Sequence, residues 1–452
     1  MQEEDKMVVA GKKVLVFGSG ISGIGAVKLL EENGADVVLY DGNEKLTEAD
    51  VRAKLQEGSK ARIIIGAFPE ELPNTLDLVI LSPGVPTDLP IILKMKEKEI
   101  PVIGEVELAY TFGKGDVLAI TGTNGKTTTK ELLAAVLSTK FNLLYTEGNF
   151  NNHISVPLTL LRLTHDHEMA VIEMGASHPG DIKELVDIVH PNYGIITNVG
   201  RAHLEGFGSF EGVIRTKGEL YDYIRRSKGK IFIKKENEYL QSIAKGIEQI
   251  TYGNGDDAFA SGQVVSCDPF LVFNWKQQGK LHTVETHMIG SYNLDNVLAA
   301  VAVGRFFKIP AERISRAIAA YEPTNNRSQF KKTENNELII DAYNANPSSM
   351  KVALDNFITM PVQPKAIILG DMRELGPTSD ELHAEVVEQI KKGQFDKVFL
   401  CGEHFSKVGK EFSPFATTEA MTEELRRQPL KGYHILIKGS HSMGLEKLAD
   451  IL

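Results

Sequence analysis

Residues 115–140 read GDVLAITGTNGKTTTKELLAAVLSTK, and this stretch decides the fold. An apolar run up to Thr121 is typical of a buried strand, and a glycine-rich turn follows it at 122–125. After this turn, apolar side chains recur at helical spacing. A strand, a glycine loop and a helix in this order are the phosphate-binding unit of an α/β protein.

Other apolar runs in the chain also end in polar or glycine turns. They start at residues 13, 36, 76, 169, 193, 230, 338, 365, 397 and 434. Such turns are where open α/β sheets bind ligands. We predict an α/β fold with three domains: a Rossmann-like domain over 1–114, a central P-loop-type domain over 115–312 and a Rossmann-like domain over 313–452.

Composition sets the broad class. The chain has 452 residues, too many for one core, with 42% hydrophobic and 24% charged residues. It has no apolar run long enough for a membrane span, and its acidic N-terminus is unlike a signal peptide. Two cysteines, Cys267 and Cys401, suit a reducing compartment. We expect a cytoplasmic monomer. The net charge of -10 argues against nucleic acid as a partner, so phosphates would need local cations.

The chain carries an earlier glycine loop, GSGISG, at residues 18–23. It matches G-x-G-x-x-G between a strand and a helix, which favours anion binding at the helix N-terminus. Asp41 ends the next strand, where a ribose-binding acid would lie. The alternative is a turn that only allows close strand–helix packing. An NAD-dependent dehydrogenase is a further alternative, but no later segment resembles a hydride-transfer site.

The loop at 122–128 gives the stronger signal. Its backbone N–H groups can cradle phosphates, Lys126 can reach the β- and γ-phosphates, and Thr127 can hold Mg²⁺. Only two residues separate Gly122 from Gly125, fewer than in the common P-loop pattern. ATP is the predicted ligand.

Three further residues could complete a phosphoryl-transfer site. Glu173 ends a predicted strand, His203 follows another strand, and Lys217 lies early in a helix. A strand-end acid is costly to bury unless it is paired or bound to a metal. Each residue also has a simpler interpretation: a loop hydrogen-bonder, a structural histidine and a solvated lysine.

Together these segments resemble the Mur ligases, the ATP-dependent amide ligases of peptidoglycan precursor synthesis, and hence of cell-wall formation, cell shape and division. From residue 122 onward the resemblance is to the D-alanyl-D-alanine-adding branch. It rests on GNFNNHISVPLTLL, EMGASHPGDI, NVGRAHLEGFGSFEGVIRTKGELYD, NNRSQ, DAYNANPSSM, LGDMRELG and KGSHSM.

Residues 11–110, with LSPGVP and GEVELAY, instead resemble the D-glutamate-adding branch. The serine-rich C-terminal signature of that branch is absent. We therefore predict a chimera joined near the shared loop at 122–128. By resemblance, the first loop would hold the UDP part of a UDP-N-acetylmuramoyl-peptide.

The resemblance implies that ATP phosphorylates the acceptor's terminal carboxylate and that an amine, D-alanyl-D-alanine or D-glutamate, attacks the acyl phosphate. It implies two Mg²⁺ ions, held by Thr127, Glu173, His203 and a carbamylated Lys217. Lys126, Lys217, His203 and Arg327 would be catalytic. The ATP-binding residues would be Gly122, Thr123, Asn124, Gly125, Lys126, Thr127, Thr128, Asn296, Arg327, Asp341, Asn344 and Asn346.

Two other sets follow from the same resemblance. Ser19, Gly20, Ile21, Ser22, Asp41, Asn43 and Gly84 would bind the UDP-sugar, and Lys438 and Ser440 the incoming amine. The chain departs from the family at Asn43, His153, Ser155 and His441. The function expected is an ADP-forming ligase that adds D-alanyl-D-alanine to a UDP-N-acetylmuramoyl-peptide. The alternatives are a D-glutamate ligase and a UDP-sugar- and ATP-binding chimera with little turnover.

Overall fold

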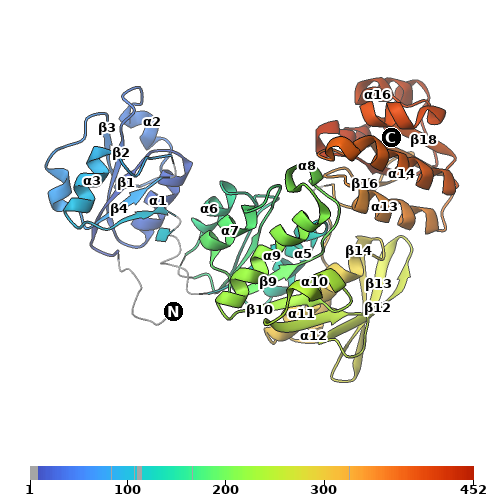
Figure 1. Ribbon diagram of the computed structural model, residues 1–452, viewed down its shortest axis with the longest axis horizontal. Coiled ribbons are helices and arrows are strands. Elements are labelled where there is room, and N and C mark those ends of the chain that lie inside the picture. The colour runs from blue at the N-terminus through green and yellow to red at the C-terminus, as the bar shows by residue number, and fades with distance from the viewer. Residues whose placement is uncertain (1–8, 83, 106, 109–114, 165, 325) are drawn as a thin grey trace. The chain divides into compact units, whose positions relative to one another are not determined.

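The protein is described by a computed structural model that covers residues 9–82, 84–105, 107–108, 115–164, 166–324 and 326–452. In this part of the chain, helices flank three sheets, which confirms the predicted α/β class (Figure 1). The chain groups into two compact units, 1–117 with 141–172 and 184–190, and 118–140 with 173–183 and 191–452. The predicted boundary at 114/115 lies at the edge of the described residues, and the domain limits stay a prediction.

The N-terminal sheet is parallel, in the order β3-β2-β1-β4-β5. Its strands span Lys13–Phe17, Asp36–Asp41, Arg62–Ile65, Leu78–Leu81 and Val102–Gly104. Helices α1 (Ile21–Glu32), α2 (Glu48–Arg52) and α3 (Pro90–Glu97) and the 3-10 turn η2 (Leu72–Thr75) connect them. The central strands are continuous apolar runs because both faces are covered. The order reverses between β1 and β4, where open sheets of this type bind ligands.

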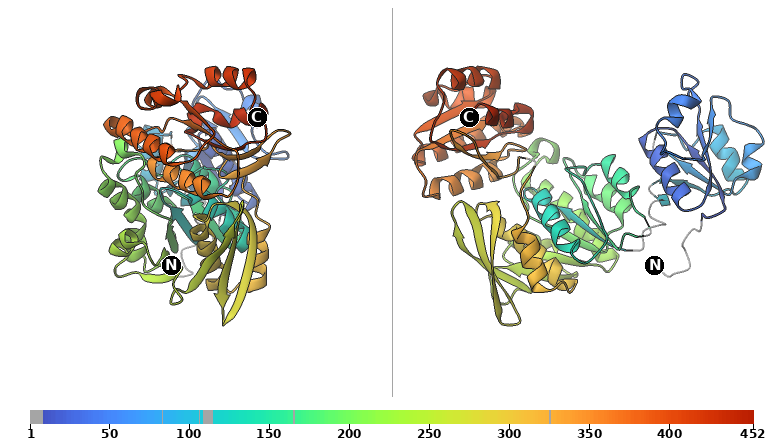
Figure 2. Two further views of the ribbon diagram at one scale, coloured as in Figure 1. Left: turned by 90° about the vertical axis from the view of Figure 1, so that its right-hand side faces the viewer. Right: turned by 180° about the vertical axis from the view of Figure 1, so that it is seen from behind.

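The central sheet has nine strands in the order β14-β13-β12-β11-β10-β9-β6-β8-β7. The predicted strands are β6 (Asp116–Thr121), β8 (Met169–Glu173), β9 (Tyr193–Ile196) and β10 (Lys230–Lys234), and β7 (Leu143–Tyr145) and β11 (Glu248–Gly253) join them. The sequence analysis did not predict β12 (Ala260–Cys267), β13 (Phe270–Gln277) and β14 (Lys280–Ile289) (Figure 2). The β12–β13 and β13–β14 pairs are antiparallel, whereas β12 is parallel to β11. Buried side chains alternate with half-buried ones along most of β13 and with exposed ones along much of β14. Polar residues therefore leave β13 only a four-residue apolar run and β14 none.

The helices around this sheet are α5 (Lys126–Leu137), α6 (Ser155–Leu160), α7 (Asp181–Val189), α8 (Leu204–Phe207), α9 (Phe210–Arg226), α10 (Glu238–Ile243), α11 (Asn293–Phe306) and α12 (Ala311–Ala319). Helix α11 is apolar on nearly all sides and lies buried against α5. A Cβ atom on Gly304 would lie 2.8 Å from Val136 and 2.9 Å from Ile314. Glycine at this position therefore lets α11 approach both α5 and α12.

The C-terminal sheet has the order β15-β16-β19-β17-β18, with only the β15–β16 pair antiparallel. Its strands span Gln329–Lys332, Glu337–Asp341, Lys365–Gly370, Lys397–Cys401 and His434–Lys438 for β15 to β19. Helices α13 (Pro347–Thr359), α14 (Ser379–Lys392), α15 (Glu403–Val408) and α16 (Thr418–Arg427) cover it, with 3-10 turns η3 (Gly376–Thr378), η4 (Lys410–Phe412), η5 (His441–Met443) and η6 (Leu445–Asp450).

Alternate residues of these strands feed two cores. Ile339 and Leu436 lie in one cluster, whereas their neighbours Ile340 and Ile437 lie in the other. Both faces of the sheet are thus apolar, which directs the polar residues of the strands to the strand ends. Within the described residues, no helix has both the length and the apolar character needed to cross a membrane.

Candidate active site

The loop between β6 and α5 has the backbone of a phosphate-binding turn. Gly122 and Gly125 have φ angles of 149° and 75°, a region that L side chains rarely adopt. A Cβ atom on Gly125 would lie 2.6 Å from Oδ1 of Asn296. Gly125 is the N-cap of α5, so the first-turn N–H groups and the positive end of the helix dipole lie at the loop.

The segment after β9 holds this loop in place. The backbone N–H of Asn124 donates to Oδ1 of Asn198 at 2.9 Å, and the hydroxyl of Thr197 donates to the carbonyl of Asn124 at 2.7 Å. The N–H of Gly200 donates to the hydroxyl of Thr123 at 2.9 Å. These three contacts join the loop to the segment that follows β9.

Two predicted metal ligands meet at the start of α5. The hydroxyl of Thr127 donates to Oε1 of Glu173 at 3.1 Å, and both side chains are buried. The ammonium of Lys126 donates to the carbonyl of Gly122 at 2.8 Å. Burial lowers the pKa of Lys126, as does Arg327, while the carboxylate of Glu173 raises it. Lys126, Thr127, Glu173 and Arg327 therefore share one electrostatic environment. Thr128, in the same helical turn, is half-buried.

Lys217 and His203 lie close enough to Lys126 of this loop for their charges to interact. Lys217 is on α9 and only 3% exposed, and burial, with the charge of Lys126, holds its pKa well below the usual range. A buried lysine that loses its proton readily is a nucleophile toward CO₂. Burial also lowers the pKa of His203, which feels the charges of Glu374, Lys126 and Lys217. Six predicted catalytic and metal-binding residues thus gather around one phosphate loop: Lys126, Thr127, Glu173, His203, Lys217 and Arg327.

Asn296, on α11, packs against the glycine loop at Gly125. Its Oδ1 accepts from the hydroxyl of Thr129 at 3.0 Å, and its Nδ2 donates to Oδ1 of Asn293 at 2.7 Å. The side chain joins α11 to α5 beneath Gly125. A contact of Asn296 with adenine stays a prediction.

The C-terminal part approaches the loop through Asn346. This residue caps α13, with its Oδ1 accepting from the N–H of Ser349, and its Nδ2 donates to Oδ1 of Asn124 at 2.9 Å. Arg327 lies with its guanidinium 3.9 Å from the ring centroid of Tyr343. His441 stacks on the same ring at 5.6 Å. Arg327 is thereby oriented by an aromatic face.

The predicted amine-binding residues make contacts inside the C-terminal part. The ammonium of Lys438 donates to Oδ2 of Asp341 at 2.5 Å and to the carbonyl of Asn344 at 3.2 Å. The hydroxyl of Ser440 accepts from the backbone N–H of Arg373 at 3.1 Å. Lys438 and Ser440 are both buried. These bonds tie the carboxyl ends of β16, β17 and β19 together.

A buried histidine organises the loop after β17. Nε2 of His383 accepts from the N–H of Met372 at 2.9 Å, and Nδ1 lies 2.6 Å from the carbonyl of Ser379. Burial lowers the pKa of His383, while the nearby acids Asp371 and Asp380 raise it and the charge of His404 lowers it. The carboxylate of Asp371 in turn accepts from the N–H groups of His404 and Phe405 at 3.0 Å each. The neutral form of His383 is therefore part of the native fold.

The first glycine loop has a network of its own. Both the N–H and the hydroxyl of Ser19 donate to Oδ2 of Asp41, at 2.8 Å and 2.6 Å, and these bonds lower the pKa of Asp41 against the effect of burial. A Cβ atom on Gly23 would lie 1.9 Å from the carbonyl oxygen of Gly18, so this glycine permits close strand–helix approach. The predicted residues Gly20, Ile21, Asn43 and Gly84 are exposed around the loop and Ser22 is half-buried.

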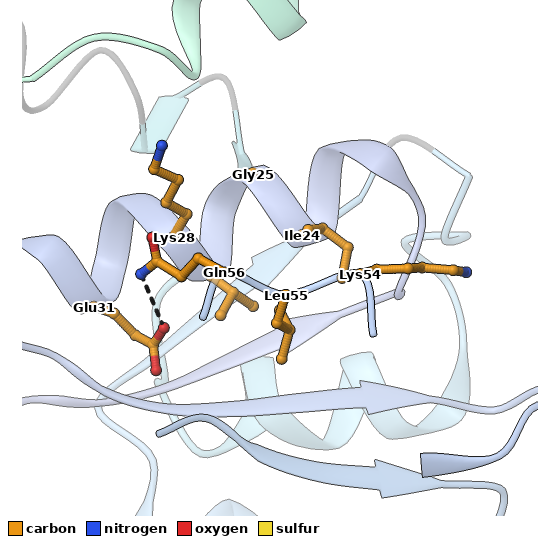
Figure 3. A pocket seen from close by; sticks show the side chains of 8 residues that line it. Ile24, Gly25, Lys28, Glu31, Lys54, Leu55 and Gln56 are labelled. Atoms are coloured by element: carbon orange, nitrogen blue, oxygen red, sulfur yellow. Dashed lines mark hydrogen bonds between the residues drawn. The ribbon is translucent and has the colours of Figure 1, made fainter. Parts of the chain in front are cut away.

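A cavity of about 240 Å³ lies beside α1. Figure 3 shows its lining, with Lys28 and Lys54 extending away from each other and Gln56 bonded to Glu31. Ile24, Gly25, Val27 and Leu55 complete the wall. The two ammonium groups do not converge in the cavity, and none of the predicted site residues lines it.

The sequence analysis assigned no role to three residues of this region. Asn198 holds the phosphate loop, Tyr343 supports Arg327, and Glu374 contacts His203. Each lies within a motif quoted above and just after a strand, and polar residues at such positions were the available signal. Their partners are distant in sequence and could not be read from the motif.

The donor set around Thr127 fits Mg²⁺. Among the described residues, no three His, Cys, Asp or Glu side chains form a metal-binding group. Mg²⁺ in nucleotide sites takes only one or two carboxylates, with phosphate oxygens and water supplying the rest. One buried carboxylate and one hydroxyl, at the N-terminus of a phosphate-loop helix, meet that requirement.

The fold and the site define a nucleotide-dependent α/β enzyme of P-loop type, with a Rossmann-like sheet on each side in sequence. Comparison with known families agrees. The Mur ligase middle domain matches residues 120–304, the "Mur ligase, glutamate ligase domain" matches 326–441, and the "Mur ligase MurD-like, N-terminal domain" matches 12–104. The chain belongs to the Mur ligase family of ATP-dependent ligases, as the resemblance predicted.

Similar proteins carry two different names within this family. The UDP-N-acetylmuramoyl-tripeptide--D-alanyl-D-alanine ligase of Bacillus subtilis is 34% identical over 74% of this chain and 75% of its own length. The UDP-N-acetylmuramoylalanine--D-glutamate ligase of Lachnoclostridium phytofermentans is 32% identical over 80% of this chain and 77% of its own. The crystal structure of MurF from Acinetobacter baumannii has a TM-score of 0.71 at 25% identity, covering 98% of this chain and 91% of that one.

These matches bear out the two-part resemblance. The N-terminal match is to a MurD-like domain, whereas sequence relatives and structural neighbours of MurF type support the assignment of the rest.

Proposed function

We propose that this protein is an ADP-forming ligase that joins D-alanyl-D-alanine to a UDP-N-acetylmuramoyl-peptide. The observation that carries the proposal is the set of Lys126, Lys217 and the buried Thr127–Glu173 pair around one glycine loop. A D-alanyl-D-alanine ligase matches 74% of this chain, and a MurF structure has a similar fold, which together support the choice of amine.

In the proposed reaction, a carboxylate oxygen of the acceptor attacks the γ-phosphorus of ATP, and the bond to ADP breaks. The amine nitrogen then attacks the acyl carbon, the C–N bond forms, phosphate leaves and the amine loses a proton. A carboxylate is a poor electrophile, so phosphorylation supplies the leaving group. The protein's part is alignment and charge neutralisation.

The residues present have matching roles. Lys126 and the N–H groups of the glycine loop would neutralise the β- and γ-phosphates, and Arg327 would orient toward the γ-phosphate on the face of Tyr343. Thr127 and Glu173 would hold Mg²⁺, which when bound offsets phosphate charge. His203 and a carbamylated Lys217 would hold a second ion.

The first glycine loop would take the UDP moiety. The exposed positions at Gly20 and Ile21 lie at the N-terminus of α1, which favours a diphosphate. Asp41 is held in place by Ser19 and by the N–H of Asn43, at the strand end where an acid would reach a nucleoside. The MurD-like match of this segment favours a short acceptor, UDP-N-acetylmuramoyl-L-alanine.

A second candidate is a D-glutamate ligase. It is favoured by the MurD-like N-terminal match and by relatives that carry that name. We further propose a monomeric enzyme of the cytoplasm, in keeping with soluble nucleotide-linked substrates.

Phosphate release from Mg-ATP tests these proposals in four pairings. The acceptors are UDP-N-acetylmuramoyl-L-alanine and the UDP-N-acetylmuramoyl-tripeptide, and the amines are D-glutamate and D-alanyl-D-alanine. Release that depends on both acceptor and D-alanyl-D-alanine supports the proposal, and the preferred acceptor identifies what the N-terminal domain selects. Release with D-glutamate but not with D-alanyl-D-alanine would favour the second candidate, a D-glutamate ligase. No phosphate release in any of the four pairings, with ATP still bound, would indicate a binding protein without turnover.

A further inference from the structure

Glu374 makes a contact that the roles above leave unexplained. It lies in LGDMRELG, after β17, and its carboxylate is the partner of Nδ1 of His203, 171 positions away. Both residues have positive φ, 61° for Glu374 and 50° for His203. Such backbone is uncommon outside glycine, costs free energy and persists only where the surroundings enforce it. Two such residues meeting through their side chains indicate that both loops are shaped for this contact.

The loop that carries Glu374 is fixed by the C-terminal part. Its Met372 N–H donates to His383 and its Arg373 N–H donates to Ser440. These two bonds hold the backbone immediately before Glu374 from different sides. The carboxylate therefore projects from a rigid support and does not depend on a flexible tip.

The same loop also lies against the segment after His203. Gly376 has a φ of 58°, and a Cβ atom there would lie 3.5 Å from Cβ of Glu205. The two loops therefore touch at a second place, Gly376 against Glu205, beside the His203–Glu374 pair. Lys126 and Lys217 are also near enough to His203 for their charges to act on the imidazole. Glu374 thus reaches the edge of the phosphate-loop site.

The chemistry of the pair selects one form of the imidazole. An ionised carboxylate only accepts hydrogen bonds, so Nδ1 of His203 carries the hydrogen. A neutral imidazole has one N–H, which leaves the lone pair on Nε2. Carboxylates paired with histidine in this way orient the ring in metal sites and raise its basicity as a ligand.

Resting on the proposed function, in which His203 holds a divalent cation, we propose that Glu374 is a positioning residue for His203. It fixes the tautomer and the orientation that present Nε2 to the cation. The metal-binding side chain belongs to the loop after β9, whereas the residue that orients it comes from the sheet proposed to bind the amine. The C-terminal part therefore completes the metal site as it docks, which links amine binding to assembly of the phosphoryl-transfer centre.

Counting bound Mn²⁺ tests the inference without turnover. Free Mn²⁺ is measured by electron paramagnetic resonance in the full-length protein with saturating ADP. Glu374→Ala is expected to weaken the second Mn²⁺ by about tenfold or more, the usual effect of removing such a partner, and to spare the first. Glu374→Gln, which keeps an acceptor oxygen, should lose less. Glu385→Gln, an exposed mid-helix residue of α14, is the matched control and should bind Mn²⁺ as the wild type does.

A double-variant cycle distinguishes positioning from direct coordination. His203→Ala should weaken the second Mn²⁺, and adding Glu374→Ala to it should cause no further loss, because the carboxylate acts through the imidazole. Additive losses would show that Glu374 binds the cation itself and would overturn the inference. Unchanged Mn²⁺ binding in Glu374→Ala, or a wild type that takes up no second Mn²⁺, would overturn it too.

Two control experiments test whether the Glu374 variant folds and how it affects turnover. The side chain of Glu374 is 59% exposed, so its removal buries no unpaired charge, and thermal unfolding checks this. In active protein, Glu374→Ala should lower kcat and leave KM for ATP within about twofold, because the first ion and the phosphate loop are intact. A mere tether between loops would raise KM for the amine and leave Mn²⁺ binding unchanged. A wild type that binds two Mn²⁺ but forms no product would sink the proposed function and leave the Glu374 result valid.

Discussion

Replacing Asp341 with Asn is expected to destabilise the C-terminal sheet more than replacing Lys438 with Met. The two residues are register partners at the ends of β16 and β19, with Nζ and Oδ2 2.5 Å apart. The side chain of Lys438 is 1% exposed and that of Asp341 is 19% exposed. Losing the acid leaves a buried ammonium uncompensated. Losing the lysine leaves a carboxylate that still reaches water and accepts from the N–H of Ser328.

The burial of each partner sets how much stability each substitution costs. Removing one member of a buried ion pair costs about 3–5 kcal/mol. Because Asp341 is partly exposed and asparagine can still accept a hydrogen bond, Asp341→Asn belongs at the lower end, about 3 kcal/mol. Lys438→Met should cost about 1–2 kcal/mol, near the cost of one unsatisfied polar group. The double variant should be no less stable than Lys438→Met, since the charge that needed a partner is gone.

Native-state hydrogen exchange of the full-length chain measures these changes. A multidomain protein gives no single unfolding free energy, so exchange is followed in peptides that cover β16 and β19. A loss of about 3 kcal/mol accelerates exchange roughly a hundredfold. The exposed pair Lys332–Glu337 is the control, and Lys332→Met should change stability by less than about 1 kcal/mol. Equal effects of Asp341→Asn and Lys438→Met, or the reverse order, would refute the reasoning. A higher KM for the amine in Lys438→Met without faster exchange would instead favour substrate binding.

Three other predictions concern the loop, the metal site and pH. Gly125→Ala should abolish detectable ATP binding in calorimetry, because its Cβ would lie 2.6 Å from Asn296 at a φ of 75°; wild-type affinity would contradict this. Thr127→Val should weaken Mg-ATP binding about tenfold or more and leave metal-free ATP binding nearly unchanged, and equal losses in both would argue against a metal-binding hydroxyl. The pKa of His383 is lower in the folded protein than in the unfolded chain. As pH falls below about 6.5, this histidine is protonated in the unfolded chain first, so the C-terminal sheet should lose stability. His383→Gln should flatten that slope in exchange measurements at pH 7 and 5, and an unchanged slope would assign it to other groups.

The sequence alone was enough to predict the three sheets and the position of the phosphate loop. These features are local: an apolar strand, a glycine turn and a helix are contiguous, and Gly122 and Gly125 are needed by the backbone itself. The same holds for Lys126 and Thr127, which the first turn of α5 places beside the loop. Glu173, His203 and Lys217 were candidates from their places at strand ends and early in a helix. Family resemblance added their roles, because their spacing along the chain carries no geometric information.

The antiparallel strands β12–β14 were beyond a search for continuous apolar runs. One face of β14 is largely exposed and carries polar residues, which break its apolar run. In β13 the apolar run Phe270–Phe273 is short, and polar residues interrupt the strand after it. The partners of Lys438 and Ser440 were equally hidden. Only the order β16-β19-β17 brings Asp341 beside Lys438, and Arg373 beside Ser440.

The sequence by itself therefore determined which chemistry this protein can carry, because glycine loops and strand ends act through neighbouring residues. The tertiary structure alone decided how that chemistry is held: Asn346 on Asn124, Tyr343 under Arg327, and Glu374 on His203. Each of these contacts depends on where a fixed loop points, and that direction is set by sheet order and helix packing, which no local pattern of residues encodes.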